Sequence, residues 1–237
     1  MRTIVNRGLV FSFLMILVAA SGAFAANVMT APKVSTPPEI DGQLDSVWSE
    51  AVLAGSYASS WELNTGGKPD VETEAWVLWD DTNLYIAFRN FQDMSVVKAA
   101  VTEDEGPAWN DDDNEIFIAP NWPEPRPYYQ FVTNPNGVRS DDKGLDFAWN
   151  GDWKVAVAKT SDAWVAEVAI PWATIGKSPK AGDEIGFNIT RRWDAGGQWI
   201  TWTPGLSSFH APEGFSTLKL IAGSEEIASL EDNPRIL

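Results

Sequence analysis

Residues 73–90 read TEAWVLWDDTNLYIAFRN, and this stretch decides the fold class. Its first seven and last seven residues are rich in β-branched and aromatic side chains, and the polar segment DDTN separates them, which predicts a β-hairpin. In the second run Leu84, Ile86 and Phe88 occupy every other position. One face of that strand is therefore expected to pack in the core.

Short runs of the same kind continue along the chain. The other predicted strands are residues 115–119, 128–133, 153–159, 163–170, 184–192, 199–202 and 216–221. Turns with Gly, Pro, Asn or Asp separate these runs, and no long amphipathic helix lies between them. The pattern predicts an all-β fold, an antiparallel β-sandwich or jelly roll, and not alternating strands and helices.

One short helix is expected near the N-terminus of this fold. Asp41 and Gly42 are a turn signal, and Leu44, Val47 and Trp48 follow at helical spacing. We therefore predict a turn followed by a short helix.

The first 25 residues have the features of a secretory signal peptide. Arg2 and Arg7 precede an apolar run over residues 8–20, and the small residues Ala23 and Ala25 predict cleavage after Ala25. The run is shorter than the ~20 residues that a transmembrane helix needs. We expect an exported protein, secreted or periplasmic, that no longer contacts the membrane after cleavage.

The chain is expected to divide into four segments. These are a signal peptide (1–25), a Pro-rich lead (26–38), one β-sandwich domain (39–222) and a C-terminal tail (223–237). Cysteine is absent, so no disulfide stabilises the domain and its stability must come from a packed core.

The composition narrows the class of partner. The formal net charge is −16, which repels nucleic acid and anionic membrane surfaces. An acidic surface suits calcium or a neutral ligand. The alternative is that the charge serves only to keep the protein soluble. The 13 tryptophans are typical of a β-rich core with additional aromatic platforms.

The segment AWNDDDNEIF at residues 108–117 allows three interpretations: a metal site, a catalytic carboxylate pair or the rim of a ligand site. Crowded carboxylates suit calcium, although the spacing is not that of an EF-hand. A glycosidase would need two carboxylates across a cleft, and no spacing singles out such a pair. A solvated acidic loop is the structural alternative.

Two aromatic residues stand out by position. Trp109 and Phe209 lie in the polar loops PAWND and GLSSFHAPE. Exposed aromatic rings stack on the apolar C–H faces of sugar rings, although a loop aromatic can also fold back on the sandwich.

Strand alternation places polar groups beside these loops. If Ile116 and Ile118 face the core, Glu115 faces the other way, and the same reasoning applies to the other strands. The residues assigned to that outer face are Gln130, Asn134, Asn188, Thr190 and Arg192. Carboxylate, amide and guanidinium groups on one face can bind sugar hydroxyls.

The ordered series IDGQLDSVW, VLWDDTNLYIAF, AWNDDDNEIFI, YYQFVTNPNG, WVAEVAIPWATI, GDEIGFNITRR and FHAPEGFSTLKL resembles the family 9 carbohydrate-binding modules of the DOMON-like β-sandwich group. The series covers about residues 39–220 in the family's order. The resemblance implies a jelly-roll sandwich that holds a sugar between two aromatic side chains, with structural calcium nearby.

The resemblance also implies roles for particular residues. Trp109 and Phe209 correspond to the aromatic clamp, and Glu115 and Asn134 to polar ligand residues. A family arginine falls on Val132, so one hydroxyl contact is missing unless Arg192 or Arg139 replaces it. Asp93 and Asp112 match acidic positions that would bind calcium. With Gln130 and Arg192 added from the strand alternation, these residues form the predicted site.

We therefore expect a non-catalytic protein that binds an oligo- or polysaccharide and serves polysaccharide catabolism, with a partner glycoside hydrolase on another chain. One alternative is a glycoside hydrolase, or its accessory subunit, with a carboxylate near Glu115 as acid. A second is a haem-binding electron carrier, as in some relatives of this group. Met29, Met94 and His210 form no evident haem-ligand pair in the sequence, so sugar binding is preferred.

Overall fold

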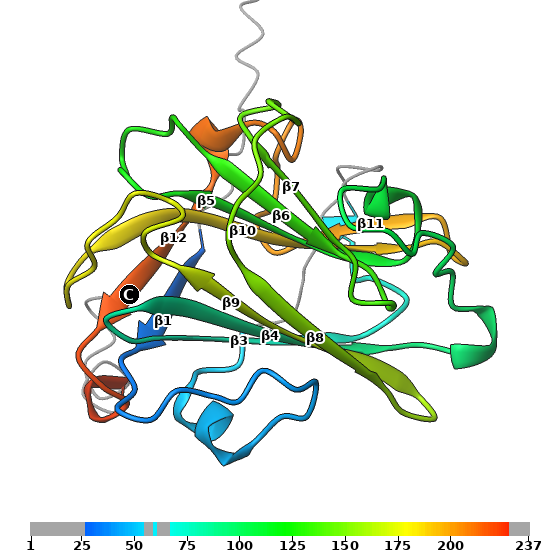
Figure 1. Ribbon diagram of the computed structural model, residues 1–237, viewed down its shortest axis with the longest axis horizontal. Coiled ribbons are helices and arrows are strands. Elements are labelled where there is room, and N and C mark those ends of the chain that lie inside the picture. Colours follow the sequence, from blue (N-terminus) through cyan, green and yellow to red (C-terminus); the bar gives the residue numbers. More distant parts are fainter. Residues whose placement is uncertain (1–26, 55–58, 61–66, 228–237) are drawn as a thin grey trace, which may run out of the picture.

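The computed structural model describes residues 27–54, 59–60 and 67–227. The expected signal peptide lies outside these residues, and so does most of the expected C-terminal tail, of which residues 223–227 are described. In this part of the chain two β-sheets face each other as a sandwich (Figure 1). The predicted all-β sandwich is confirmed.

The smaller sheet has four strands in the order β3-β4-β9-β8, all antiparallel. Its strands are β3 (Thr73–Trp79), β4 (Asn83–Phe91), β8 (Lys154–Lys159) and β9 (Ala163–Pro171). The predicted hairpin is β3-β4, in which Thr73 pairs with Asn90 and Trp79 with Leu84. Asp80 closes its turn, because one carboxylate oxygen accepts from the backbone N–H groups of Thr82 and Asn83, each at 2.7 Å.

The larger sheet has the strand order β1-β12-β10-β5-β6-β7. In addition, β11 pairs with β10, and β2 pairs with β11. Its strands are β1 (Val28–Pro32), β2 (Ser59–Ser60), β5 (Asp113–Ala119), β6 (Tyr129–Thr133), β7 (Arg139–Lys143), β10 (Glu184–Trp193), β11 (Gln198–Thr201) and β12 (Ser216–Ile221). The β1-β12 pair is parallel and the other pairs are antiparallel.

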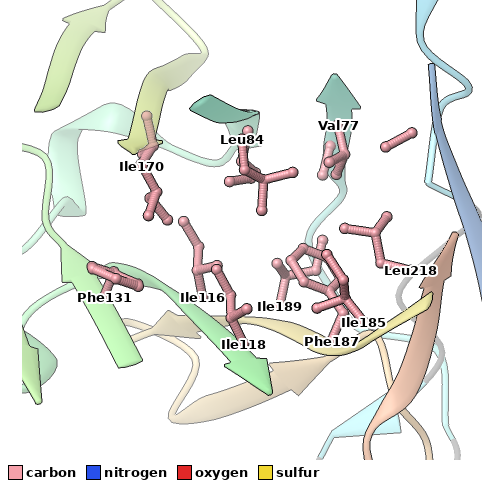
Figure 2. Close-up of a cluster of buried hydrophobic side chains, with 14 of the residues drawn as sticks. Val77, Leu84, Ile116, Ile118, Phe131, Ile170, Ile185, Phe187, Ile189 and Leu218 are labelled. Carbon is pink, nitrogen blue, oxygen red and sulfur yellow. The ribbon is translucent and has the colours of Figure 1, made fainter. Parts of the chain in front are cut away.

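The main core lies between the two sheets. Figure 2 shows side chains of the smaller sheet, among them Val77, Leu84 and Ile170, above side chains of the larger sheet. The larger sheet contributes Ile116, Ile118, Phe131, Ile185, Phe187, Ile189 and Leu218, each at most 1% exposed. The alternation predicted for these strands is therefore confirmed, and it sends the residues between them to the outer face of the larger sheet.

The expected short helix is the 3-10 helix η1 (Ser46–Glu50), which Asp45 caps by accepting from the Val47 N–H. It lies against the outer face of the smaller sheet (Figure 1). Trp48 is buried there, and its indole N–H donates to Glu167 at 2.7 Å. The preceding Gly42 has φ +87°, and a Cβ at this position would lie 2.8 Å from the Ala158 nitrogen, so the close approach requires glycine.

Three strands were not predicted. β1 lies within the Pro-rich lead, β2 is only two residues long, and β7 has the sequence RSDDK, which lacks the apolar alternation of a strand. Three-residue 3-10 turns complete the fold: η3 (Met94–Val96), η4 (Ala108–Asn110) and η5 (Pro212–Gly214). None of the helices in the described part of the chain has the length and apolar character needed to span a membrane.

Candidate functional site

A pocket of about 380 Å³ opens on the outer face of the larger sheet, on the side away from the main core. Strands β5, β6, β10 and β11 and three loops supply its lining. The lining residues are Trp109, Glu115, Gln130, Phe147, Arg192, Trp199, Ser208, Phe209 and His210. Five of the six residues predicted to bind a ligand are therefore brought together here.

Glu115 and Gln130 lie side by side on β5 and β6, and each is 5% exposed. The Gln130 side-chain amide donates to the Glu115 carboxylate at 2.5 Å. Burial raises the pKa of Glu115 to about 7, although this hydrogen bond and Arg192 act in the opposite direction. Near neutral pH the carboxyl group is present in both protonation states, so it can donate to a hydroxyl group or accept from one.

Asp113 lies two residues earlier on the same face of β5 and is fully buried. One of its oxygens accepts from the Arg192 backbone N–H at 3.1 Å, and the other has no hydrogen-bond partner among the described residues. Burial, and then the charge of Glu115, raise its pKa well above the usual value. The sheet beneath the pocket therefore holds two adjacent carboxyl groups, and ionisation of one disfavours ionisation of the other.

Arg192 organises one wall of the pocket. Its guanidinium group lies over the Trp199 ring at 4.7 Å from the centroid and donates to the Asp194 carboxylate at 2.8 Å. A second, longer bond at 3.4 Å reaches the Trp109 carbonyl. Trp199 is the direct strand partner of Arg192 in the β10-β11 hairpin. These contacts fix the arginine between two tryptophans.

Phe209 lies on the loop that precedes β12 and is only 8% exposed. It packs on Phe117, an outward-facing residue of β5, with ring centroids 6.1 Å apart. The adjacent His210 contacts Phe117 edge-on, and its Nδ1 lies 3.0 Å from the Tyr128 hydroxyl. Phe209 thus folds back on the sandwich and still contributes to the pocket wall.

Trp109 and Phe147 form the exposed rim. Trp109, in the turn η4 before β5, is 38% exposed, and Phe147, in the loop after β7, is 60% exposed. Their ring centroids are 6.0 Å apart and the planes are tilted by 42°. Trp109 thus has a ring contact with Phe147, and Phe209 has one with Phe117. The predicted clamp of Trp109 and Phe209 around a ligand stays a prediction, although both rings line the pocket.

Asn134 is the predicted ligand residue that does not line the pocket. It is fully buried, and its amide donates to the Val101 carbonyl and to Asp111, both at 2.9 Å. Its oxygen accepts from the backbone N–H groups of Asn136 and Val138. Strand β6 ends at Thr133, so the alternation that places Gln130 in the pocket does not extend to Asn134. Its amide instead joins the loop before β5 to the turn after β6.

The two residues expected to bind calcium make other contacts. Asp112 is fully buried and accepts from the N–H groups of Lys98 and Asp194 and from the Gln92 side chain, at 2.8 to 3.0 Å. Asp93 is exposed and caps η3 by accepting from Ser95. In the described part of the chain no three Asp, Glu, His or Cys side chains are grouped to hold a metal. As arranged, these side chains do not fit a calcium site, and calcium binding stays a prediction.

The haem alternative would need Met29 or Met94 near His210. Met29 lies in the main core and is 5% exposed, and Met94 packs against the same core. His210 lines the pocket on the other side of the larger sheet. The described residues therefore do not bring a methionine and this histidine together.

Sequence reasoning did not assign Phe147, Trp199, Ser208 and His210 to the pocket. Phe147 meets the criterion that selected Trp109, an aromatic residue in a polar loop, and could have been found in GLDFAWN. Trp199 could have been found from the turn DAGG, because a hairpin there places it opposite Arg192.

Comparison with known proteins places this geometry in context. Residues 40–222 match the family described as "Carbohydrate family 9 binding domain-like". Endo-1,4-beta-xylanase A of Thermotoga neapolitana is 34% identical over 210 residues, a match that covers 82% of this chain and 18% of the xylanase. The chain therefore spans less than one fifth of that enzyme.

Two solved structures of a family 9 carbohydrate-binding module from Caldicellulosiruptor kristjanssonii share the fold. The complex with cellotriose has a TM-score of 0.65, and the complex with glucose has a TM-score of 0.64. Both are 18% identical to this chain and cover 83% of it, and the alignments include 94% and 96% of the module.

Proposed function

This chain belongs to the carbohydrate family 9 binding domains, and we propose that it is an exported, non-catalytic protein that binds a saccharide in the pocket on the outer face of its larger sheet. The observation that carries the proposal is the combination of an exposed aromatic rim with a buried polar floor. A pyranose ring presents the same two surfaces, apolar C–H faces and a hydroxyl edge.

In this proposal the aromatic residues bind one face of the sugar and the floor binds its edge. Trp109, with its exposed ring, stacks on the C–H face, and Phe209 closes the pocket from the loop before β12. Glu115 and Gln130 bond the hydroxyl groups, and each can donate or accept. Arg192 holds Trp199 and the Trp109 backbone in place.

The lining of the pocket argues against hydrolysis. A glycosidase needs two carboxylates on opposite sides of the scissile bond, about 5–5.5 Å apart in retaining enzymes and 6.5–9.5 Å apart in inverting ones. Glu115 is the only acid among the residues that line this pocket. Asp113, the nearest second carboxyl group along the strand, is buried beneath the pocket and is not opposite Glu115.

Export and a role in polysaccharide catabolism complete the proposal. The features of residues 1–25 support export to the periplasm or the medium. The matched part of the Thermotoga xylanase is 18% of that enzyme, so a family 9 domain there accompanies other segments of the same chain. We propose that the present chain acts in the same process beside a glycoside hydrolase on another chain.

Isothermal titration with glucose, cellotriose and xylotriose tests the proposal. We expect dissociation constants on the order of micromolar to millimolar for at least one sugar, because the pocket is open and the contacts are few. Trp109→Ala should weaken binding by about tenfold or more, since burial of an aromatic side chain is worth roughly 1–3 kcal/mol.

The matched control is Trp76→Ala. Trp76 is a partly buried tryptophan on the outer face of the smaller sheet, away from the pocket, where Arg89 lies over its ring. This variant should bind the sugar as the wild type does. Binding that Trp109→Ala leaves unchanged would contradict the assignment of the pocket, and the absence of binding to all three sugars would contradict the function.

A further inference from the structure

Two segments that bring tryptophans to the pocket contact each other at its edge. The first is the loop of residues 92–112, between β4 and β5, which carries Trp109. The second is the turn of residues 194–197, between β10 and β11, which precedes Trp199. A loop as long as the first needs anchors if it is to hold an exposed ring in a fixed position. The contacts between the two segments therefore bear on the shape of the pocket.

Asp112 joins the two segments through their backbones. One carboxylate oxygen accepts from the Lys98 N–H at 2.9 Å, and the other accepts from the Asp194 N–H at 2.8 Å. The Asp112 N–H in turn donates to the Lys98 carbonyl at 3.1 Å. Asp112 is fully buried, so water does not compete for these bonds. The junction brings Lys98 and Asp194 to the same place.

The side chains of Lys98 and Asp194 add an ion pair across this junction. The Lys98 ammonium group lies 3.1 Å from the Asp194 carboxylate, and the Arg192 guanidinium group lies 2.8 Å from the same oxygen, Oδ1. Lys98 belongs to the loop of Trp109, and Arg192 lies over the Trp199 ring. Asp194 thus connects the two segments through one carboxylate oxygen that two cations share.

Neither Lys98 nor Asp194 lines the main pocket, whereas Trp109, Arg192 and Trp199 do. The Lys98 and Asp194 side chains are partly exposed, at 41% and 26%. Salt screens an ion pair of this kind, so its strength depends on ionic strength. Any effect of these two residues on the affinity for a neutral sugar acts through the wall of the pocket and not through contact with the ligand.

We propose that Lys98 and Asp194 are positioning residues of the sugar pocket. Their ion pair, shared with Arg192, holds the loop of Trp109 against the turn that precedes Trp199, and so raises the affinity for a neutral sugar that neither residue contacts. A pocket whose walls are already in place loses less conformational freedom when the ligand binds. This inference rests on the proposed function, because the ligand is the saccharide of the main pocket.

A double-mutant cycle measured by isothermal titration tests the proposal. The ligand is the sugar among glucose, cellotriose and xylotriose that the wild type binds most tightly. Lys98→Met and Asp194→Asn each remove one charge of the pair and keep the backbone N–H groups that donate to Asp112. Each should weaken binding by about two- to fivefold, as expected for a partly exposed ion pair. In the Asp194→Asn background Lys98→Met should have no further effect, because the pair is already broken.

Salt gives a readout that a merely structural role would not change. A neutral sugar has no net charge, so its direct contacts depend little on ionic strength. If the ion pair positions the wall, wild-type affinity should fall by about twofold between 20 mM and 500 mM sodium chloride, because salt screens the pair. Asp194→Asn should remove this fall. Titration at pH 8 keeps the Glu115 carboxyl group, whose pKa is about 7, mainly ionised at both salt concentrations.

The matched control is Glu74→Gln, on the outer face of the smaller sheet. Arg89 lies over the Trp76 ring there and pairs with Glu74 at 3.0 Å, which repeats the arrangement of Asp194, Arg192 and a tryptophan. None of the three control residues lines the main pocket. Glu74→Gln should leave the affinity and its salt dependence unchanged. Thermal unfolding of each variant checks that it is folded at the temperature of the titration.

The outcomes distinguish the inference from the function on which it rests. Wild-type affinity in Lys98→Met would overturn the inference and leave the proposed function standing. The same conclusion would follow if Lys98→Met weakened binding equally in both backgrounds, if the salt dependence persisted in Asp194→Asn, or if Glu74→Gln weakened binding as much as Asp194→Asn. The absence of wild-type binding to all three sugars would overturn both proposals.

Discussion

The Glu115 carboxylate and the Gln130 amide meet at 2.5 Å on adjacent strands, both 95% removed from solvent, at the floor of the pocket. The amide N–H stabilises the charged form of the carboxyl group, but burial opposes it and has the larger effect, so the pKa rises to about 7. Folding therefore favours the protonated form of Glu115.

This relationship predicts how stability depends on pH. Because the folded-state pKa is raised above the ordinary value of 4.5, the native state binds more protons than the unfolded state between pH 4.5 and about 7. The free energy of unfolding should decrease as pH rises through this window. Each unit of pKa is worth about 1.4 kcal/mol, so a rise from 4.5 to about 7 makes the contribution of this group roughly 3 kcal/mol.

Urea unfolding of the wild type and of Glu115→Gln between pH 4 and 8 measures the effect. Glutamine keeps the shape and does not titrate, so the stability of the variant relative to the wild type should increase with pH across the window. A constant difference between the two proteins would show that Glu115 titrates normally in the folded state.

Asn134 and Gln130 should respond differently to substitution. Asn134→Ala removes two donated and two accepted hydrogen bonds from a buried position, which should lower the free energy of unfolding by about 2–4 kcal/mol. Gln130→Ala should instead weaken sugar binding severalfold. Titration and urea unfolding of both variants separate the two roles. Loss of affinity in a stable, folded Asn134→Ala protein would restore the ligand role that the family resemblance implies.

Calcium should have little effect on the stability of the protein if Asp112 accepts the hydrogen bonds that the structure shows. Its carboxylate accepts three N–H groups of the protein, so Asp112→Ala should cost about 3 kcal/mol of stability with or without calcium. The exposed Asp93 is the matched control, and Asp93→Ala should change stability much less than Asp112→Ala does. Thermal unfolding with EDTA or with calcium checks this. A melting temperature that calcium raises in the wild type and not in Asp112→Ala would establish the metal site.

The sequence predicted the site wherever strand periodicity determined it. Ile116 and Ile118 face the core, so the position of Glu115 on the outer face followed from alternation alone, and Gln130 followed from Phe131 in the same way. Asn134 was expected on the ligand face with Gln130, but its strand ends one residue earlier and it does not line the pocket, so its role as a ligand residue stays a prediction.

The loops could not be predicted in the same way, because their positions depend on contacts between distant segments. The sequence left open whether Phe209 is exposed in its loop or folds back on the sandwich. It folds back, because its ring packs on the outward-facing Phe117 of β5. Phe147 lies beside Trp109 only because β7 returns the chain to the pocket, and the polar sequence of β7 did not predict a strand.

The charge of the site predicts discrimination against anionic sugars. Glu115, which carries a negative charge in its ionised form, lines the main pocket, and the whole chain carries a net charge of −16. Arg192 offers little compensation, because Asp194 already neutralises it at 2.8 Å. Glucuronate should therefore bind about tenfold or more weakly than glucose at low ionic strength, if glucose binds. The difference should shrink as salt is added, because the screening length falls to ~10 Å at 0.1 M and to ~3 Å at 1 M.

Titration of both sugars at 20 mM and 500 mM sodium chloride measures this. Tighter binding of glucuronate that Arg192→Gln abolishes would mean that the arginine leaves Asp194 to bind the ligand, and that the wall of the pocket rearranges on binding.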